Sequence, residues 1–208
     1  MVSTEFSACL ERLKHHGIPP IPRLALDLHI KVEASPRLLA HHFLVHQAAA
    51  TLLSELNKIV PGLKIDGEAV LFGAATHDIG KAVVTRELSE PGREHEILGF
   101  VLLMENSVPA SPARFAKDHG LGSELDHIED FLVCLADKVW KGKRDQALEE
   151  TFIKAVCDSE HLEFWDIYPC ITSLLDQVAA EADMRLAIQA EFPCPAVVEA
   201  EPPVKRPR

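Results

Sequence analysis

The chain has 208 residues, of which 47% are hydrophobic and 25% charged, a composition typical of a globular protein with one domain of ordinary size. Its formal net charge of -11 argues against general binding to nucleic acids or anionic membranes, because both require a basic surface. No segment approaches the length of a membrane span, and the five scattered cysteines are typical of a reduced, cytoplasmic protein.

Helical patterns account for most of the chain. An amphipathic pattern predicts a short helix over 4–15, whereas the alternation in LALDLHIKV (24–32) predicts a strand or an extended edge segment. Ser35 and Pro36 form an N-cap with proline at the first helical position, which predicts a helix through about Lys58. Asp66 can cap a helix over 67–80. Further helices are expected at 94–106, 111–118, 124–141, 145–158 and 162–190.

These elements predict an all-α fold with one helical bundle. We expect four parts along the chain: an N-terminal helix with an extended segment (1–34), a helical core (35–144), C-terminal helices that pack on the core (145–191), and a tail (192–208). The tail is rich in proline, and we expect it to be disordered.

Two histidines lie on the apolar stripe of the helix that follows Ser35. His42 and His46 are four residues apart and therefore share one face of that helix. The same face continues through Leu39 and Ala49, so both imidazoles are expected to be buried. One buried histidine is more often a core residue than a ligand, but a pair on one stripe favours a metal modestly.

Two aspartates also follow apolar runs. His77 and Asp78 follow the run 69–75 after one intervening residue, Thr76, and Asp137 comes directly after the run 131–136. A buried carboxylate is unfavourable without a partner, and Lys138 cannot serve Asp137 because adjacent helical residues point in different directions. Both aspartates therefore require partners from other helices.

A divalent metal would satisfy such a set of side chains. Imidazole nitrogens and carboxylate oxygens together suit Mn, Fe, Co, Ni, Zn or Mg, and helical bundles hold metals with side chains from facing helices. A buried hydrogen-bond network without a metal explains the same residues. The residue pattern alone leaves both interpretations open.

The order of His46, the His77-Asp78 doublet and Asp137 resembles the H…HD…D signature of the HD-domain superfamily, whose members are mostly metal-dependent phosphohydrolases. The resemblance covers roughly residues 36–144, and HDIGKA and LADKVWKGKR are its most specific pieces. It implies that these four residues hold a divalent metal in a helical core. His42, one turn from His46, is the alternative first ligand.

The resemblance also suggests roles for further residues. His95 and His119 resemble the additional histidines with which some members hold a second metal or contact the phosphate, so one or two ions are expected. Asp78 is then the central catalytic ligand. Lys81 is a candidate for catalysis or for phosphate binding, with a lysine near a helix end as the alternative. The other cationic candidates for substrate binding are Arg93, Lys138 and Lys141.

The reaction implied by the resemblance is hydrolysis of a phosphomonoester or phosphodiester, in a nucleotide or another small phosphate ester, by a metal-activated water. No glycine-tyrosine-proline motif follows His119, which argues against the cyclic di-GMP phosphodiesterases of the superfamily. The alternative function is a non-catalytic sensory module that binds a ligand or a metal. A helical scaffold with a buried polar network is a third interpretation, which two buried aspartates make unfavourable. The completeness of the histidine set favours the enzyme.

Overall fold

The computed structural model describes residues 3–118, 125 and 127–194, and these residues form helices joined by turns, without a strand. The prediction of an all-α fold is confirmed. The helices are α1 (Thr4–His15), α2 (Arg23–Lys31), α3 (Pro36–Ile59), α4 (Gly67–Ala74), α5 (Glu94–Glu105), α6 (Ala110–Asp118), α7 (Ile128–Val139), α8 (Gln146–Glu160), α9 (Phe164–Ala180) and α10 (Ala182–Ala190), with the short 3₁₀ helices η1 (Ile79–Ala82) and η2 (Thr85–Leu88).

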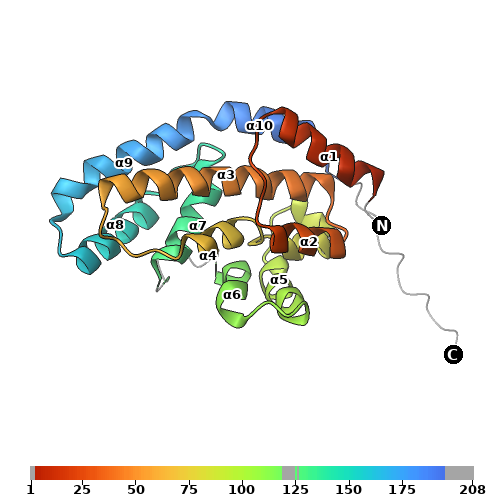
Figure 1. Cartoon of the computed structure of the whole chain (residues 1–208), viewed down its shortest axis with the longest axis horizontal. Helices are drawn as coiled ribbons and strands as arrows, with labels where there is room; N and C mark the ends of the chain where they lie inside the picture. Colours follow the sequence, from red (N-terminus) through yellow and green to blue (C-terminus); the bar gives the residue numbers. More distant parts are fainter. Residues whose placement is uncertain (1–2, 119–124, 126, 195–208) are drawn as a thin grey trace, which may run out of the picture.

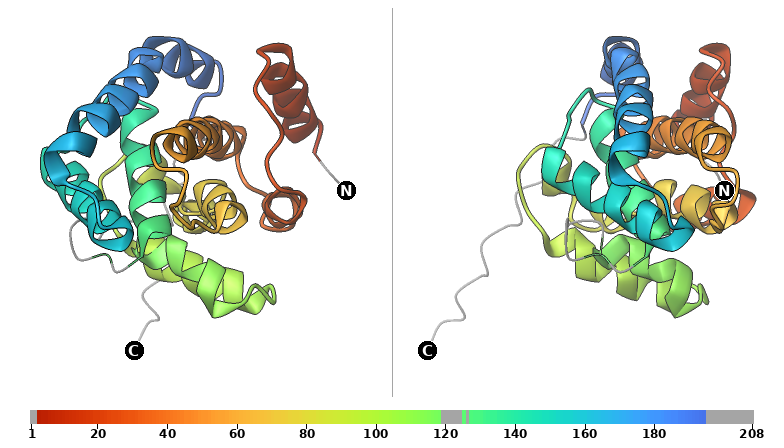
Figure 2. Two further views of the ribbon diagram at one scale, coloured as in Figure 1. Left: turned by 60° about the vertical axis from the view of Figure 1, so that its left-hand side comes forward. Right: turned by 90° about the vertical axis from the view of Figure 1, so that its left-hand side faces the viewer.

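The 24-residue helix α3 runs through the middle of the molecule (Figure 1). It packs against α9 and α10 on one side and against α4 and α7 on another, and α9 and α10 arch around it (Figure 2). Helices α5 and α6 form a hairpin that packs on η1 and α4. The candidate ligands therefore come from three elements that contact one another: α3, the segment after α4, and α7.

The start of α3 follows the predicted capping chemistry. The Ser35 hydroxyl oxygen accepts a hydrogen bond from the Leu38 amide at 3.3 Å, and Pro36 occupies the first turn. These contacts satisfy one of the amides that a helix leaves unpaired at its N-terminus. They also fix where α3 begins, and the first turns of α3 carry candidate ligands.

The strand predicted over 24–32 is wrong, because this segment is helix α2. The buried residues are Ala25, Leu28 and His29, whose spacing of three and four residues is that of one helical face. The alternation in the sequence is therefore incidental. Leu24, which the alternating pattern would bury, is 52% exposed.

Other boundaries also differ from the prediction. The helix expected over 67–80 ends at Ala74, and the one expected over 162–190 is two helices that meet at Glu181. The tail expected from 192 onward begins with the buried residue Phe192, which is 3% exposed. Residues 119–124, 126 and 195–208, which include His119 and the rest of the tail, lie outside the described residues.

The described helices include none that is long and apolar enough to cross a lipid bilayer. All five cysteines are free thiols.

Candidate metal centre

The His77-Asp78 doublet lies in the turn that connects α4 to η1. The His77 amide continues the helical pattern by donating to the Gly73 carbonyl at 2.8 Å, and Asp78 then ends it with a φ of -100° and a ψ of 12°. Gly80 follows in a position where a Cβ atom would lie 2.1 Å from the His95 carbonyl oxygen. The absence of a side chain at Gly80 therefore lets η1 touch α5, and this contact brings His95 to the doublet.

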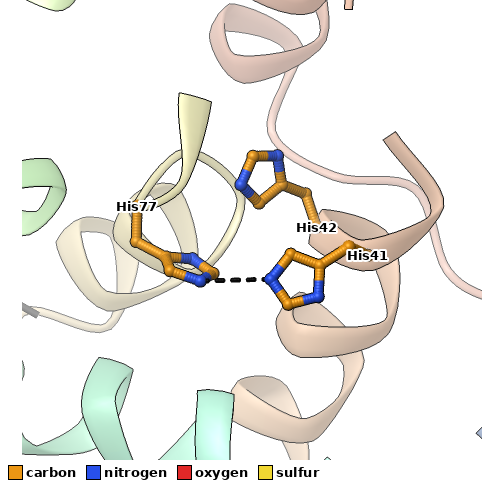
Figure 3. Close-up of side chains that lie close together, drawn as sticks. All are labelled: His41, His42 and His77. Carbon is orange, nitrogen blue, oxygen red and sulfur yellow. Dashed lines mark hydrogen bonds between the residues drawn. The ribbon is translucent and has the colours of Figure 1, made fainter. Parts of the chain in front are cut away.

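Four side chains converge at the doublet: His41 from α3, His77 and Asp78, and Asp137 from α7. The His41 Nε2 atom lies 3.3 Å from His77 Nε2, 3.3 Å from Asp78 Oδ2 and 3.6 Å from Asp137 Oδ1. The His77 Nε2 atom lies 3.7 Å from both carboxylates. Figure 3 shows the rings of His41 and His77 pointing toward each other from the two elements.

These separations fit a single metal ion. Ligands placed ~2.1 Å from a common ion lie ~3.4 Å apart in a tetrahedron and ~3.0 Å apart as neighbours in an octahedron. The five observed separations, 3.3 to 3.7 Å, are close to the tetrahedral value. Two imidazoles and two carboxylates are also a donor set that divalent transition metals accept.

The imidazole of His77 is oriented as metal ligands usually are. Its Nδ1 lies 3.2 Å from the Ala74 carbonyl oxygen, which only accepts, so Nδ1 carries the proton. In the neutral ring Nε2 then presents a lone pair to the cluster. Burial lowers the pKa of His41 to about 4 in spite of the Asp78 carboxylate, so His41 is also a neutral, ligand-competent imidazole at pH 7.

Each carboxylate of the cluster has an ammonium group nearby. Lys81 Nζ lies 2.5 Å from Asp78 Oδ2, and Lys141 Nζ lies 3.1 Å from Asp137 Oδ2. Burial by itself would raise the pKa of Asp137, but its close contact with His77 and the positive charge of Lys141 lower it well below its usual range. Asp137 is therefore an ionised ligand at neutral pH.

A second pair of side chains extends the cluster beyond Asp78. His95 Nε2 lies 2.9 Å from Asp78 Oδ1, and its Nδ1 donates to Glu87 Oε2 at 2.5 Å. The Glu87 carboxylate also accepts from the amides of Glu94 and His95. Burial would raise the pKa of Glu87, but the hydrogen bonds from His95 and Glu94 lower it. Asp78 and His95 could therefore hold a second ion, with Glu87 orienting the imidazole.

Comparison with known proteins agrees with this geometry. Residues 38–140 match the family model described as HD domain. The chain belongs to the HD-domain superfamily. No curated protein and no solved structure matches the chain. The HD domain identifies the superfamily, which consists mostly of metal-dependent phosphohydrolases, and it does not specify a substrate.

The α3 histidine that the structure brings to the doublet is His41, whereas the predicted His46 is not among the side chains gathered there. His46 lies five residues beyond His41, which places it ~140° away around α3, because each residue of an α-helix turns by ~100°. It is buried, and within the described structure its Nδ1 has no hydrogen-bond partner. Because α3 is a continuous α-helix here, His41 and His46 lie on different faces of it.

His42, the alternative first ligand, contacts the doublet in a different way. The nitrogens of His41, His42 and His77 that could hold a metal lie within 4.8 Å of one another (Figure 3). However, His42 Nε2 accepts a hydrogen bond from the Asp78 amide at 3.2 Å, and His42 Nδ1 lies 2.6 Å from His29 Nε2. Both of its nitrogens are thus used, and His42 supports the HD motif without offering a lone pair to the cluster.

Other predicted residues have different positions. The structure brings together six of the predicted residues, namely His77, Asp78, Lys81, His95, Asp137 and Lys141. His119 lies outside the described residues. Arg93 is paired with Glu96, and Lys138 is paired with Asp145. Two residues of the site were not predicted from the sequence. The sequence indicates Glu87 only as an acidic residue shortly before His95. The other is Arg37.

Arg37 belongs to a small cavity beside the four ligand candidates. This cavity has a volume of about 150 Å³ and opens to the surface. It is lined by Arg37, Leu38, His41, Asp78, Lys81, Leu88 and Gln189. The cavity therefore joins the metal-binding residues to two cationic side chains and to the C-terminal helix α10.

Proposed function

We propose that this protein is a metal-dependent phosphohydrolase that acts on a small phosphate ester, such as a nucleotide. The observation that carries the proposal is the set of four donors at metal-ligand spacing beside a cavity that contains Arg37 and Lys81. Membership of the HD-domain superfamily supports the reaction class. The five free cysteines support a location in the reducing cytoplasm.

The size of the cavity supports a site for one phosphoryl group. Its volume of about 150 Å³ is smaller than the ~300 Å³ at which cavities for whole small molecules begin. We therefore expect the phosphoryl group to enter the cavity, with the leaving group directed to its open mouth. A substrate of this shape requires few contacts beyond its phosphate.

Arg37 and Lys81 are the proposed anion-binding residues. Arg37 Nη1 donates to the carbonyl oxygens of Gln189 at 2.8 Å and Phe192 at 3.3 Å. These bonds hold the guanidinium in place and leave the N–H groups of Nε and Nη2 for a phosphoryl oxygen. Lys81 is held by Asp78 and adds a second positive charge to the same cavity.

The residues of the chain have distinct roles in the proposed reaction. A divalent ion held by His41, His77, Asp78 and Asp137 would supply Lewis-acid activation of water and of the phosphoryl oxygen. Arg37 and Lys81 would bind the phosphoryl group and neutralise the charge that develops on its oxygens. His95, with its Nδ1 proton held by Glu87, would keep Nε2 directed at Asp78.

The proposal is tested first by metal content and turnover. Protein purified without chelator is analysed for transition metals and is then assayed with Mn²⁺ on an aryl phosphate and a panel of nucleotides. We expect stoichiometric metal and phosphate release, and both should be lost in Asp137→Asn. Metal binding without release from any substrate would favour the sensory module, and absence of both would refute the proposal.

The anion-binding role has its own test with a matched control. Arg37→Gln should raise KM for the phosphate ester more than it lowers kcat, because it removes a binding charge next to the phosphoryl group. Arg93→Gln is the control, since Arg93 is paired with Glu96 and lies on the exposed surface. Equal kinetics for Arg37→Gln and wild type would exclude Arg37 from substrate binding.

A further inference from the structure

Two fully buried histidines form a chain that leads from α2 to the backbone of the HD motif. His29 on α2 and His42 on α3 are both 0% exposed, and their rings meet edge to face with centroids 4.8 Å apart. His29 Nε2 and His42 Nδ1 are 2.6 Å apart. At one end of the chain His42 Nε2 contacts the Asp78 amide, and at the other His29 Nδ1 contacts the Ala25 carbonyl oxygen.

The two ends of the chain determine where its protons lie. A backbone amide only donates, so His42 Nε2 must accept from Asp78, and the neutral ring carries its proton on Nδ1. That Nδ1 donates to His29 Nε2, which leaves the His29 proton on Nδ1. A carbonyl oxygen only accepts, and the Ala25 carbonyl receives this last proton at 2.7 Å. If both imidazoles are neutral, this is the one placement of their protons in which all four ring nitrogens have a hydrogen-bond partner.

We propose that His29 is a positioning residue for the metal centre, acting by fixing the His42 tautomer that holds the Asp78 backbone. The inference rests on the proposed function in one respect, namely that Asp78 is a metal ligand. Among the described residues, the hydrogen bonds of His29 go to His42 and to the Ala25 carbonyl oxygen rather than to a ligand side chain. His29 lies in α2, outside residues 38–140 that match the HD family model. The segment before the HD domain would therefore help to position a metal ligand within it.

The loss of His29 has a specific consequence. Without an acceptor opposite its Nδ1, His42 would bury an unsatisfied N–H group, or it would change tautomer and present Nε2–H to the Asp78 amide. Two donors facing each other repel, so the turn that carries Asp78 would shift. The carboxylate of Asp78 faces His41 and His95 at 3.3 and 2.9 Å, and a shift of the turn changes both distances.

The test compares two substitutions of His29 with a matched control. His29→Leu removes the acceptor, whereas His29→Gln keeps an acceptor oxygen for His42 and a donor for the Ala25 carbonyl. His46→Leu is the control, because His46 is also a buried histidine, 5% exposed, on α3 but outside the chain of hydrogen bonds. Mn²⁺ binding to each metal-free protein is measured by calorimetry, and folding by circular dichroism.

We expect His29→Leu to weaken Mn²⁺ binding by roughly 10- to 100-fold, as for other residues that orient metal ligands. His29→Gln should recover most of the affinity, and His46→Leu should keep the wild-type value. Equal losses in His29→Leu and His46→Leu would overturn the inference, because general damage to the core would then explain them. Wild-type protein that binds no Mn²⁺ would instead refute the metal site itself.

A second readout needs no metal. The ¹⁵N chemical shifts of the imidazole nitrogens in metal-free wild-type protein report which nitrogen carries the proton. We expect His29 and His42 both to carry it on Nδ1, and His42 to move away from this state in His29→Leu. An Nε2–H tautomer at His42 in the wild type would overturn the inference even if the metal binds.

Discussion

His46 offers a clear prediction about stability and pH. It is buried in α3, and among the described residues its Nδ1 has no hydrogen-bond partner. Burial lowers its pKa from 6.5 to about 4. We predict that His46→Leu stabilises the protein and reduces the loss of stability on acidification, because leucine has neither an unsatisfied polar atom nor a titrating group.

The sign and size of the pH effect follow from the two pKa values. As the pH falls below 6.5, the unfolded chain binds a proton at residue 46 while the native protein remains neutral until about 4, so unfolding becomes easier. Between about pH 7.5 and pH 5 this difference lowers the free energy of unfolding by ~2 kcal/mol. Removing the unsatisfied nitrogen adds ~1–3 kcal/mol in favour of the variant at neutral pH.

The assay is urea unfolding of wild type and His46→Leu at both pH values, with chelator present so that metal binding does not contribute. The other histidines titrate equally in the two proteins, so the difference between the two pH dependences isolates His46. A variant with the same pH dependence as the wild type would refute the reasoning. A variant that is less stable at neutral pH would show that Nδ1 has a partner or that leucine does not fit the space.

Three further experiments test the site. His41→Ala should abolish Mn²⁺ binding measured by calorimetry, whereas His46→Ala should retain it; the opposite order would restore His46 as the first ligand. Glu87→Gln should lower metal affinity or activity by ~10- to 100-fold, because a neutral amide cannot accept the three hydrogen bonds that orient His95; unchanged metal titrations and kinetics would show that Glu87 is structural. Gly80→Ala should lower the free energy of unfolding in urea by ~1–3 kcal/mol, since its Cβ would lie 2.1 Å from the His95 carbonyl oxygen, and wild-type stability would contradict that close approach.

The first ligand shows what a hydrophobic pattern can and cannot identify. The stripe that contains His42 and His46 correctly predicted that both are buried, at 0% and 5% exposure. A residue that holds a catalytic metal must instead lie where the core meets the cavity, and His41, with 12% of its side chain exposed, lies at that edge. Helical periodicity therefore does not single out His41, because the position of His41 is defined by the cavity next to it.

Other parts of the site depend on contacts between distant segments. The apolar runs before Asp78 and Asp137 were enough to predict two buried or partly buried carboxylates that need partners. Nothing near Arg37 in the sequence indicates that the carbonyls at the end of α10 hold it, since its partner Gln189 is 152 residues away. The helix over 23–31 was missed for a similar reason, because its hydrophobic face is completed by packing and by the bond between His29 and His42.

The segments on either side of the HD family match have different relations to the site. Among the described residues, His29 of helix α2 makes its hydrogen bonds to His42 and to the Ala25 carbonyl, so changes in α2 should alter metal affinity without altering substrate choice. The C-terminal segment lies at the cavity, where Gln189 lines the space and the carbonyls of Gln189 and Phe192 hold Arg37. Changes in α10 should therefore alter KM and substrate preference while the metal remains bound. Metal binding and substrate recognition would then be separable within one small HD protein.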